Sequence, residues 1–299
     1  MATKPREEAA EVVVPIRRGR RAFEGVPEVS FATKRAEVNV VEPPVADGWP
    51  EGKEKCWFLL GDGGTGKTTV VKWMVGRRQE QGRGGALLAA LDPGKRGRSL
   101  ASWFSDVEEP EEGEDPSRWL GALTDDLRDD PRSAMTDFGG GGQVALTGLV
   151  KKTKEFHKTL ENDKIGLVAC YTLGHRLDNL IVLNDLEESG FQPKATLLLV
   201  NEGIPDPTRP ASEVFEAIRN HSAYRNAVKR GAIPIWMPRL DSEVMEEIER
   251  KRLSFTMARD GKVPAGATFS AIGGWKRSAV TRWMDLMEEA FKPVATWLP

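Results

Sequence analysis

The stretch that most constrains the fold of this chain is CWFLLGDGGTGKTTVVKW, residues 56–73. A short apolar run of the kind that forms buried strands leads into a glycine-rich turn, and a helix-like run follows it. Within it, residues 61–68 match the pattern G-x-x-x-x-G-K-[ST] in full, and a strand before it and a helix after it are the context that gives this pattern meaning. Glycines let successive backbone N–H groups point into one concavity, to which the helix adds its positive end. The stretch therefore predicts a phosphate-binding loop (P-loop).

The residue types in this loop also predict individual roles. Lys67 is expected to reach the β- and γ-phosphates of a nucleotide, and the hydroxyl of Thr68 is expected to ligate Mg²⁺. The predicted nucleotide-binding residues of the loop are Gly61, Asp62, Gly63, Gly64, Thr65, Gly66, Lys67, Thr68 and Thr69.

The rest of the chain alternates short apolar runs with helix-like segments, which indicates βαβ units and a parallel sheet. Strands are expected at 56–60, 85–91, 165–171, 195–200 and 232–237, and helices at 67–81, 143–161, 176–189, 211–229 and 241–252. We therefore predict an α/β fold with a mostly parallel, doubly wound sheet flanked by helices. The nucleotide would bind at the carboxyl ends of the strands.

Composition divides the 299 residues into regions. Residues 1–50 are rich in proline and lack a sustained period, so they are expected to form an extended or disordered arm before a P-loop domain at 51–299. In the arm, the basic cluster RRGRR (17–21) is either a solvated charge run or a docking segment for nucleic acid or an acidic partner. Residues 106–117 are strongly acidic and are expected to form a solvated surface loop. The 250–282 region holds eight basic residues against Asp260 alone, a segment charge of +7.

Other features mainly exclude functions. A net charge of −2 predicts no general attraction to nucleic acid, so any such attraction would need a local patch. Two distant cysteines make no metal-ligand spacing and are expected to be reduced thiols of a cytoplasmic protein. The charged N-terminus is not expected to be a secretory signal, and no apolar run is long enough to predict a membrane span. The three histidines form no pattern with acids or cysteines, and we expect them at the surface or an interface.

Five pieces in order resemble the ParA/MinD family of deviant Walker A ATPases. The resemblance begins at the GGTGKTT of the loop. Four later segments resemble, in order, the family's second strand with switch I, its switch II, its strand that ends in asparagine, and its late I-P segment. In sequence these four segments are ALLAALDPGKRGRSLASWF (86–104), SAMTDFGGGG (133–142), TLLLVNEG (196–203) and IPIWMPRLDSEVMEEIERKRLSF (233–255). Together they extend over about 200 residues.

The chain departs from the family pattern at two positions that matter for chemistry. Asp62 stands where the family has a lysine that reaches a partner's nucleotide across a dimer, and a carboxylate there would repel a triphosphate by about 1 kcal/mol even in water. Ala90 replaces the first carboxylate of the family's D-x-D-P motif. We expect Asp62 either to point away to solvent or to be used with a cation or a basic partner group.

The resemblance implies roles for residues outside the loop. Asp92 is the candidate for orienting the attacking water and Asp137 for holding Mg²⁺ through its shell, although each is also a plausible turn residue. The implied catalytic residues are Lys67, Asp92 and Asp137, and the implied metal-site residues are Thr68, Asp92 and Asp137. Asn201, Pro238 and Arg239 would lie near adenine, with loop capping as the alternative for Asn201. The candidates for DNA contacts are Arg250, Lys251, Arg252, Lys276, Arg277 and Arg282, with a solvated face as the alternative.

The function implied by the resemblance is slow, Mg²⁺-dependent ATP hydrolysis in DNA segregation, plasmid partition or mobilisation. It implies ATP-dependent homodimerisation, nonspecific DNA binding and a partition or mobilisation factor as partner, with no membrane attachment. Two alternatives stay open. One is a nucleotide-gated adaptor that hardly hydrolyses ATP, which the changes at Asp62 and Ala90 favour. The other is a P-loop kinase or ligase acting on a small molecule.

Overall fold

A computed structural model describes residues 53–91, 100–139, 142–153, 156–161, 164–203 and 209–299. Within them, seven parallel strands form one sheet in the order β3-β2-β4-β1-β5-β6-β7. The strands are β1 (Glu54–Leu60), β2 (Leu87–Leu91), β3 (Val107–Glu108), β4 (Ala134–Phe138), β5 (Ile165–Leu173), β6 (Ala195–Asn201) and β7 (Ile233–Met237). The predicted parallel α/β fold is therefore confirmed, while the arm predicted at 1–50 lies outside the described residues.

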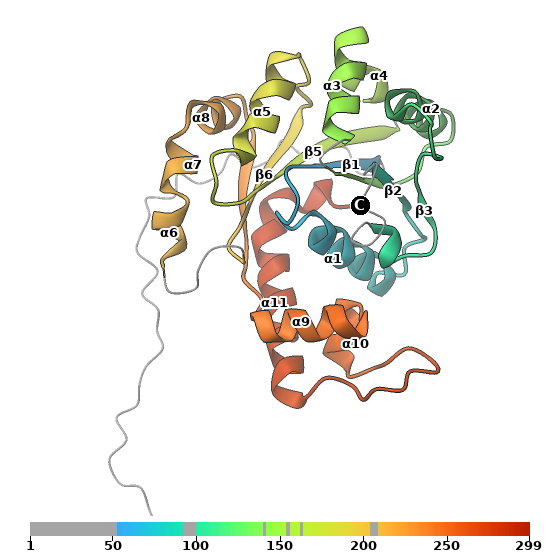
Figure 1. The fold of residues 1–299 in the computed structure, drawn as a ribbon, viewed down its shortest axis with the longest axis vertical. Coiled ribbons are helices and arrows are strands. Elements are labelled where there is room, and N and C mark those ends of the chain that lie inside the picture. The colour runs from blue at the N-terminus through green and yellow to red at the C-terminus, as the bar shows by residue number, and fades with distance from the viewer. Residues whose placement is uncertain (1–52, 92–99, 140–141, 154–155, 162–163, 204–208) are drawn as a thin grey trace, which may run out of the picture. The chain divides into compact units, whose positions relative to one another are not determined.

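Helices cover both faces of this sheet (Figure 1). One face packs against α1 (Lys67–Glu80), α9 (Ser242–Lys251), α10 (Phe255–Asp260) and α11 (Gly274–Phe291). The other packs against α2 (Pro116–Asp129), α3 (Gly142–Lys152), α4 (Phe156–Leu160), α5 (Asn179–Glu188), α7 (Glu216–Asn220) and α8 (Ser222–Lys229). The short α6 (Ala211–Val214) precedes α7. Side chains of β1 alternate between the two cores, as the twofold period of a strand requires.

The central strands are buried on both faces, which explains their nearly continuous apolar sequences. β1 lies between β4 and β5, so Leu59 pairs with Asp137 on one side and with Cys170 on the other. The carboxyl ends of β4, β1, β5 and β6 consequently meet along one edge of the sheet. The P-loop follows β1 at the middle of that edge.

The predicted helices at 67–81, 176–189 and 241–252 correspond to single helices, whereas two other predicted helices are divided. The 143–161 segment holds two helices, α3 and α4, and the 211–229 segment holds three, α6 to α8. The imidazole of His221 caps α8 by accepting from the backbone N–H of Ala223 at 3.2 Å, which starts a new helix in the middle of the predicted one.

The acidic 106–117 segment is not wholly a loop. Its seven acidic residues are exposed as predicted, but it also contains the edge strand β3 and the first turn of α2. Asp115 caps α2 by accepting from the N–H of Ser117 at 2.9 Å, and Pro116 occupies the first helical position. The composition of the segment predicts solvated charge at Asp115, whereas its carboxylate caps a helix.

Two further buried groups correct or extend the sequence reading. His157 was expected at the surface, yet it is buried with its ring 6.0 Å from that of Phe191. Lys72 of α1 is also buried, with its ammonium 3.1 Å from the centroid of the Trp103 ring, and burial lowers its pKa to about 8.

None of the described helices is both long and apolar enough to cross a membrane.

Candidate nucleotide-binding site

Two glycines of the loop occupy positions where no other residue fits. Gly61 has φ 131°, and a Cβ there would lie 2.5 Å from the carbonyl oxygen of Thr172. Gly66 has φ 104° and caps α1, and a Cβ there would lie 2.5 Å from Nδ2 of Asn201. These close approaches let the loop lie directly against the ends of β5 and β6. The glycine pattern of the sequence is therefore a requirement of the packing.

Lys67 places its ammonium inside the loop. Its Nζ donates to the carbonyl oxygens of Gly61 at 2.8 Å and Asp62 at 2.9 Å, and the residue is buried. A phosphate oxygen would offer this ammonium a charged acceptor in place of two neutral carbonyls, and charge-assisted hydrogen bonds are stronger. The geometry suits the phosphate-binding role predicted for Lys67.

Thr68 and Asp137 meet across the sheet edge. Thr68 Oγ1 donates to Asp137 Oδ2 at 3.1 Å, joining the start of α1 to the end of β4. A hydroxyl beside a carboxylate is a set of hard oxygen donors, the chemistry that Mg²⁺ takes. These two residues therefore fit the metal predicted for them. Within the described residues, no group of three or more His, Cys, Asp and Glu side chains can hold a metal ion.

The unusual carboxylate of Asp62 is held by an amide. Asn179, buried at the first position of α5, donates from Nδ2 to Asp62 Oδ2 at 2.6 Å. The bond holds the Asp62 side chain against α5, so its partner is a neutral amide and neither solvent alone nor the cation or basic group that was expected. The sequence did not single out Asn179, and it offered no signal beyond a polar residue at a helix start.

Asn201 contacts the loop in this structure. Its Nδ2 donates to the carbonyl oxygen of Thr65 at 2.9 Å, and its Oδ1 accepts from the N–H of Gly203 at 2.8 Å. Thr65 is held from another side by Thr172, their hydroxyls 2.6 Å apart. This arrangement favours the loop-capping alternative for Asn201 over a contact with adenine.

Pro238 and Arg239 follow β7, and their place near adenine stays a prediction. Arg239 Nε donates to the carbonyl oxygen of Glu202 at 3.0 Å, and the carbonyl of Pro238 accepts from Trp283 Nε1 at 2.8 Å. The segment after β7 is thus fixed both to the residue that follows Asn201 and to α11. Asp92, by contrast, lies outside the described residues, although Leu91 ends β2 directly before it.

Gln143 is a site residue that the sequence reading missed. It is buried in the first turn of α3, and its Nε2 donates to the carbonyl oxygen of Gly61 at 2.6 Å. The same oxygen accepts from Lys67. The available signal was its place as the first polar residue after the glycine run that follows Asp137.

The structure pairs much of the basic 250–282 region with acids. Lys251 and Lys276 both donate to Glu247, at 2.6 and 2.7 Å, and Lys276 also contacts Glu243 at 2.5 Å. These hydrogen bonds lower the pKa of Glu247 to about 2. Among the remaining DNA-contact candidates, Arg250, Arg252, Arg277 and Arg282 are exposed. The folded region thus has a smaller local charge than its sequence.

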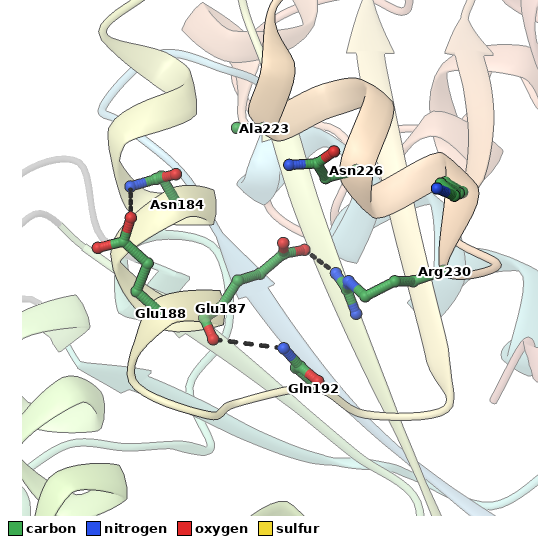
Figure 2. Close-up of a pocket in the computed structure, with 8 residues that line it drawn as sticks. Asn184, Glu187, Glu188, Gln192, Ala223, Asn226 and Arg230 are labelled. Atoms are coloured by element: carbon green, nitrogen blue, oxygen red, sulfur yellow. Dashed lines mark hydrogen bonds and ion pairs between the residues drawn. The ribbon is translucent and has the colours of Figure 1, made fainter.

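A polar groove lies away from this site, between α5 and α8 (Figure 2). It encloses about 550 Å³ and contains an ion pair between Glu187 and Arg230 and a hydrogen bond from Asn184 to Glu188 at 2.8 Å. The groove residues belong to the second half of α5, to α8, and to the segments that enter β6 and β7. They therefore lie at the amino edge of the sheet, opposite the P-loop.

The chain matches no protein-family model and no curated protein. Similar solved structures include the signal recognition particle receptor FtsY from Elizabethkingia anophelis in complex with GDP, with 14% identity, 65% of this chain and 61% of that chain covered, and a TM-score of 0.39. FtsY of Thermotoga maritima has 15% identity, coverage of 63% and 62%, and a TM-score of 0.39. FtsY of Mycoplasma mycoides has 15% identity, coverage of 63% and 60%, and a TM-score of 0.35.

This chain thus spans about three fifths of the length of those structures. TM-scores below 0.5 assign no family. The chain's own sheet order and loop geometry identify a P-loop nucleotide-binding fold. Its membership of the ParA/MinD family stays a prediction.

Proposed function

We propose that this protein is a Mg²⁺-dependent ATPase that works as a slow nucleotide switch of the ParA type. The observation that carries the proposal is the convergence of Lys67, Thr68 and Asp137 at the carboxyl end of β1. A buried ammonium, a hydroxyl and a carboxylate there supply the groups that phosphoryl transfer requires around a triphosphate.

In this proposal each residue has a role that its contacts support. Backbone N–H groups of the loop bind phosphate oxygens, and Lys67 exchanges its two carbonyl acceptors for the phosphates. Thr68 and Asp137 would hold Mg²⁺, which when bound neutralises charge on the β- and γ-phosphates. Asn179 keeps the Asp62 carboxylate directed to α5, which lowers its repulsion of the nucleotide.

The choice of ATP and the cellular role rest on the resemblance to ParA/MinD ATPases. In that role ATP would drive homodimerisation and DNA binding through exposed arginines such as Arg250 and Arg282. A partition or mobilisation factor would be the protein partner. The pairing of Lys251 and Lys276 with Glu247 leaves those arginines as the better candidates for phosphate contacts.

Binding of ATP and GTP to the full chain with Mg²⁺ tests the proposal. We expect Lys67→Ala to weaken ATP binding by at least about 100-fold, because it removes a charge-assisted contact from a buried site. Lys292→Ala, at an exposed lysine, is the control and should bind as the wild type does. Wild-type affinity in Lys67→Ala would overturn the site, and a clear preference for GTP would overturn the choice of ATP.

Retention on nonspecific double-stranded DNA tests the cellular role. The proposal expects retention that needs ATP and falls steeply with salt. Tight ATP binding without phosphate release or DNA retention would instead support the nucleotide-gated adaptor. Phosphate transfer to an added small molecule would support the kinase alternative.

A further inference from the structure

Gln143 is held against the P-loop beside Lys67. Its Nε2 and the Nζ of Lys67 both donate to the carbonyl oxygen of Gly61, at 2.6 and 2.8 Å, so the two nitrogens lie within 5.4 Å of each other. Lys67 is the residue that reaches the β- and γ-phosphates in a loop of this kind. The Gln143 amide therefore lies near the ammonium that is expected to contact the β- and γ-phosphates.

The backbone around Gln143 is fixed by close packing. A Cβ on Gly142 would lie 2.3 Å from the carbonyl oxygen of Leu91, and that oxygen also accepts from the N–H of Gly139 at 3.1 Å. Both ends of the turn between β4 and α3 thus rest on the last residue of β2. This packing positions Gln143 between the P-loop and the strand that leads to Asp92.

We propose that Gln143 orients the water that attacks the γ-phosphate, an inference that rests on the proposed hydrolytic function. In the step, a water oxygen forms a bond to the γ-phosphorus and the bond from that phosphorus to the β,γ-bridging oxygen breaks. The bridging oxygen leaves with the electron pair on ADP, and the water proton passes to the released phosphate or to solvent. The products are ADP and inorganic phosphate.

The chemistry of an amide suits this position. Its carbonyl accepts a hydrogen bond from the water, and its N–H donates to an oxygen that carries negative charge. Because the amide is neutral at all working pH values, it brings no repulsion to the triphosphate. It takes no proton itself, so it acts by orientation alone.

The alternative is that Gln143 only braces the P-loop through Gly61. A brace and a water-orienting group differ in what they change. Loss of a brace would weaken nucleotide binding and slow catalysis together. Loss of the orienting group lowers the rate of the chemical step at saturating nucleotide and leaves binding nearly unchanged.

The experiment measures ATP affinity and single-turnover phosphate release at saturating Mg²⁺-ATP for wild type, Gln143→Leu, Gln143→Glu and Val144→Ala. Val144 is the matched control because it is 73% exposed in the same helical turn. We expect Gln143→Leu to release phosphate at least about 30-fold more slowly with affinity within about threefold. Val144→Ala should match the wild type.

Gln143→Glu separates the two roles even if Gln143→Leu folds poorly. It loses the donor to Gly61 but keeps an acceptor for water, so we expect a rate at least about tenfold above that of Gln143→Leu. Should Gln143→Leu not fold, a Gln143→Glu rate within tenfold of the wild type supports orientation and a larger loss overturns it.

Three other results overturn the inference. These are equal losses in both Gln143 variants, parallel losses of affinity and rate in Gln143→Leu, or no loss at all. A wild type that binds ATP but releases no phosphate overturns it together with hydrolysis and leaves nucleotide binding standing. Lys67→Ala reports on binding separately.

Discussion

The polar network around the P-loop and the basic 250–282 region both hold predicted functional residues but differ in how they are built. The P-loop network is partly buried and its contacts join residues far apart in sequence, such as Thr68 with Asp137 and Asp62 with Asn179. In the basic region, the contacts of Lys251, Lys276 and Arg259 with acids are ion pairs nearer the surface. Buried hydrogen bonds are costly to break, while surface ion pairs are worth little.

The two regions differ in how strongly their sequence patterns determine the positions of side chains. A glycine motif constrains the backbone, and the backbone then dictates where its neighbours lie. A count of charges constrains nothing locally, because partners such as Glu247 come from outside the counted segment. Mutations should therefore have large effects in the first region and small ones in the second.

The largest effect is expected at the loop glycines. Gly61→Ala should destabilise the fold by about 2–4 kcal/mol and abolish ATP binding, because the new Cβ meets Thr172. Gly64→Ala is the matched control: it also has a positive φ, but open space surrounds it, so its cost should be about 1–2 kcal/mol. Urea unfolding and ATP titration measure both effects, and equal costs at the two positions would contradict the packing argument.

A smaller effect is expected at the amide that holds Asp62. Asn179→Ala should weaken ATP binding about 5- to 10-fold, because the freed carboxylate repels phosphate by about 1 kcal/mol. Titration of the double variant Asp62→Asn with Asn179→Ala provides the control, since it removes the charge and should restore most of the affinity. A double variant as weak as Asn179→Ala would show that repulsion is not the cause.

The smallest effect is expected in the basic region. Glu247→Gln should lower stability at neutral pH by about 1 kcal/mol, because the amide oxygen can still accept hydrogen bonds from the two lysines and only the charge is lost. The folded-state pKa of Glu247 is about 2, below its unfolded value, so the stabilisation is present above about pH 5 and is lost as the pH falls toward 2.

Urea unfolding between pH 7 and pH 3 follows this difference, with Glu246→Gln at an exposed neighbour as the control. A difference between wild type and Glu247→Gln that grows on acidification would refute the pairing. The same variant removes one negative charge beside Lys251 and Lys276, so any DNA retention should increase.

The sequence predicted the part of the site that eight consecutive residues encode. Gly61 to Thr68 carry their own backbone requirements, and the alternating apolar runs predict the parallel sheet around them. The residues that complete the site, Gln143, Thr172 and Asn179, come from other elements. Their roles follow from the order of strands in the sheet, which local patterns do not determine.

Other misses also have local physical causes. The run that ends in Asp115 and Pro116 has a loop-like composition, yet these two residues are what start α2. The three helices of 211–229 look like one because His221 is seldom counted as a capping residue. The sequence predicts His157 at the surface or an interface. Its burial depends on a contact with Phe191, which lies 34 residues later in the chain, and no local pattern indicates that contact.

The sequence separation of the site's contacts also bears on how the chain reaches its native state. Hydrogen bonds that span 69, 117 and 136 residues cannot form until the central strands have paired in register. Closing such long loops costs entropy before any contact repays it, so topologies of this kind fold slowly. A nucleotide consequently has no site to occupy in early collapsed states. It stabilises the chain by mass action only after the sheet is complete.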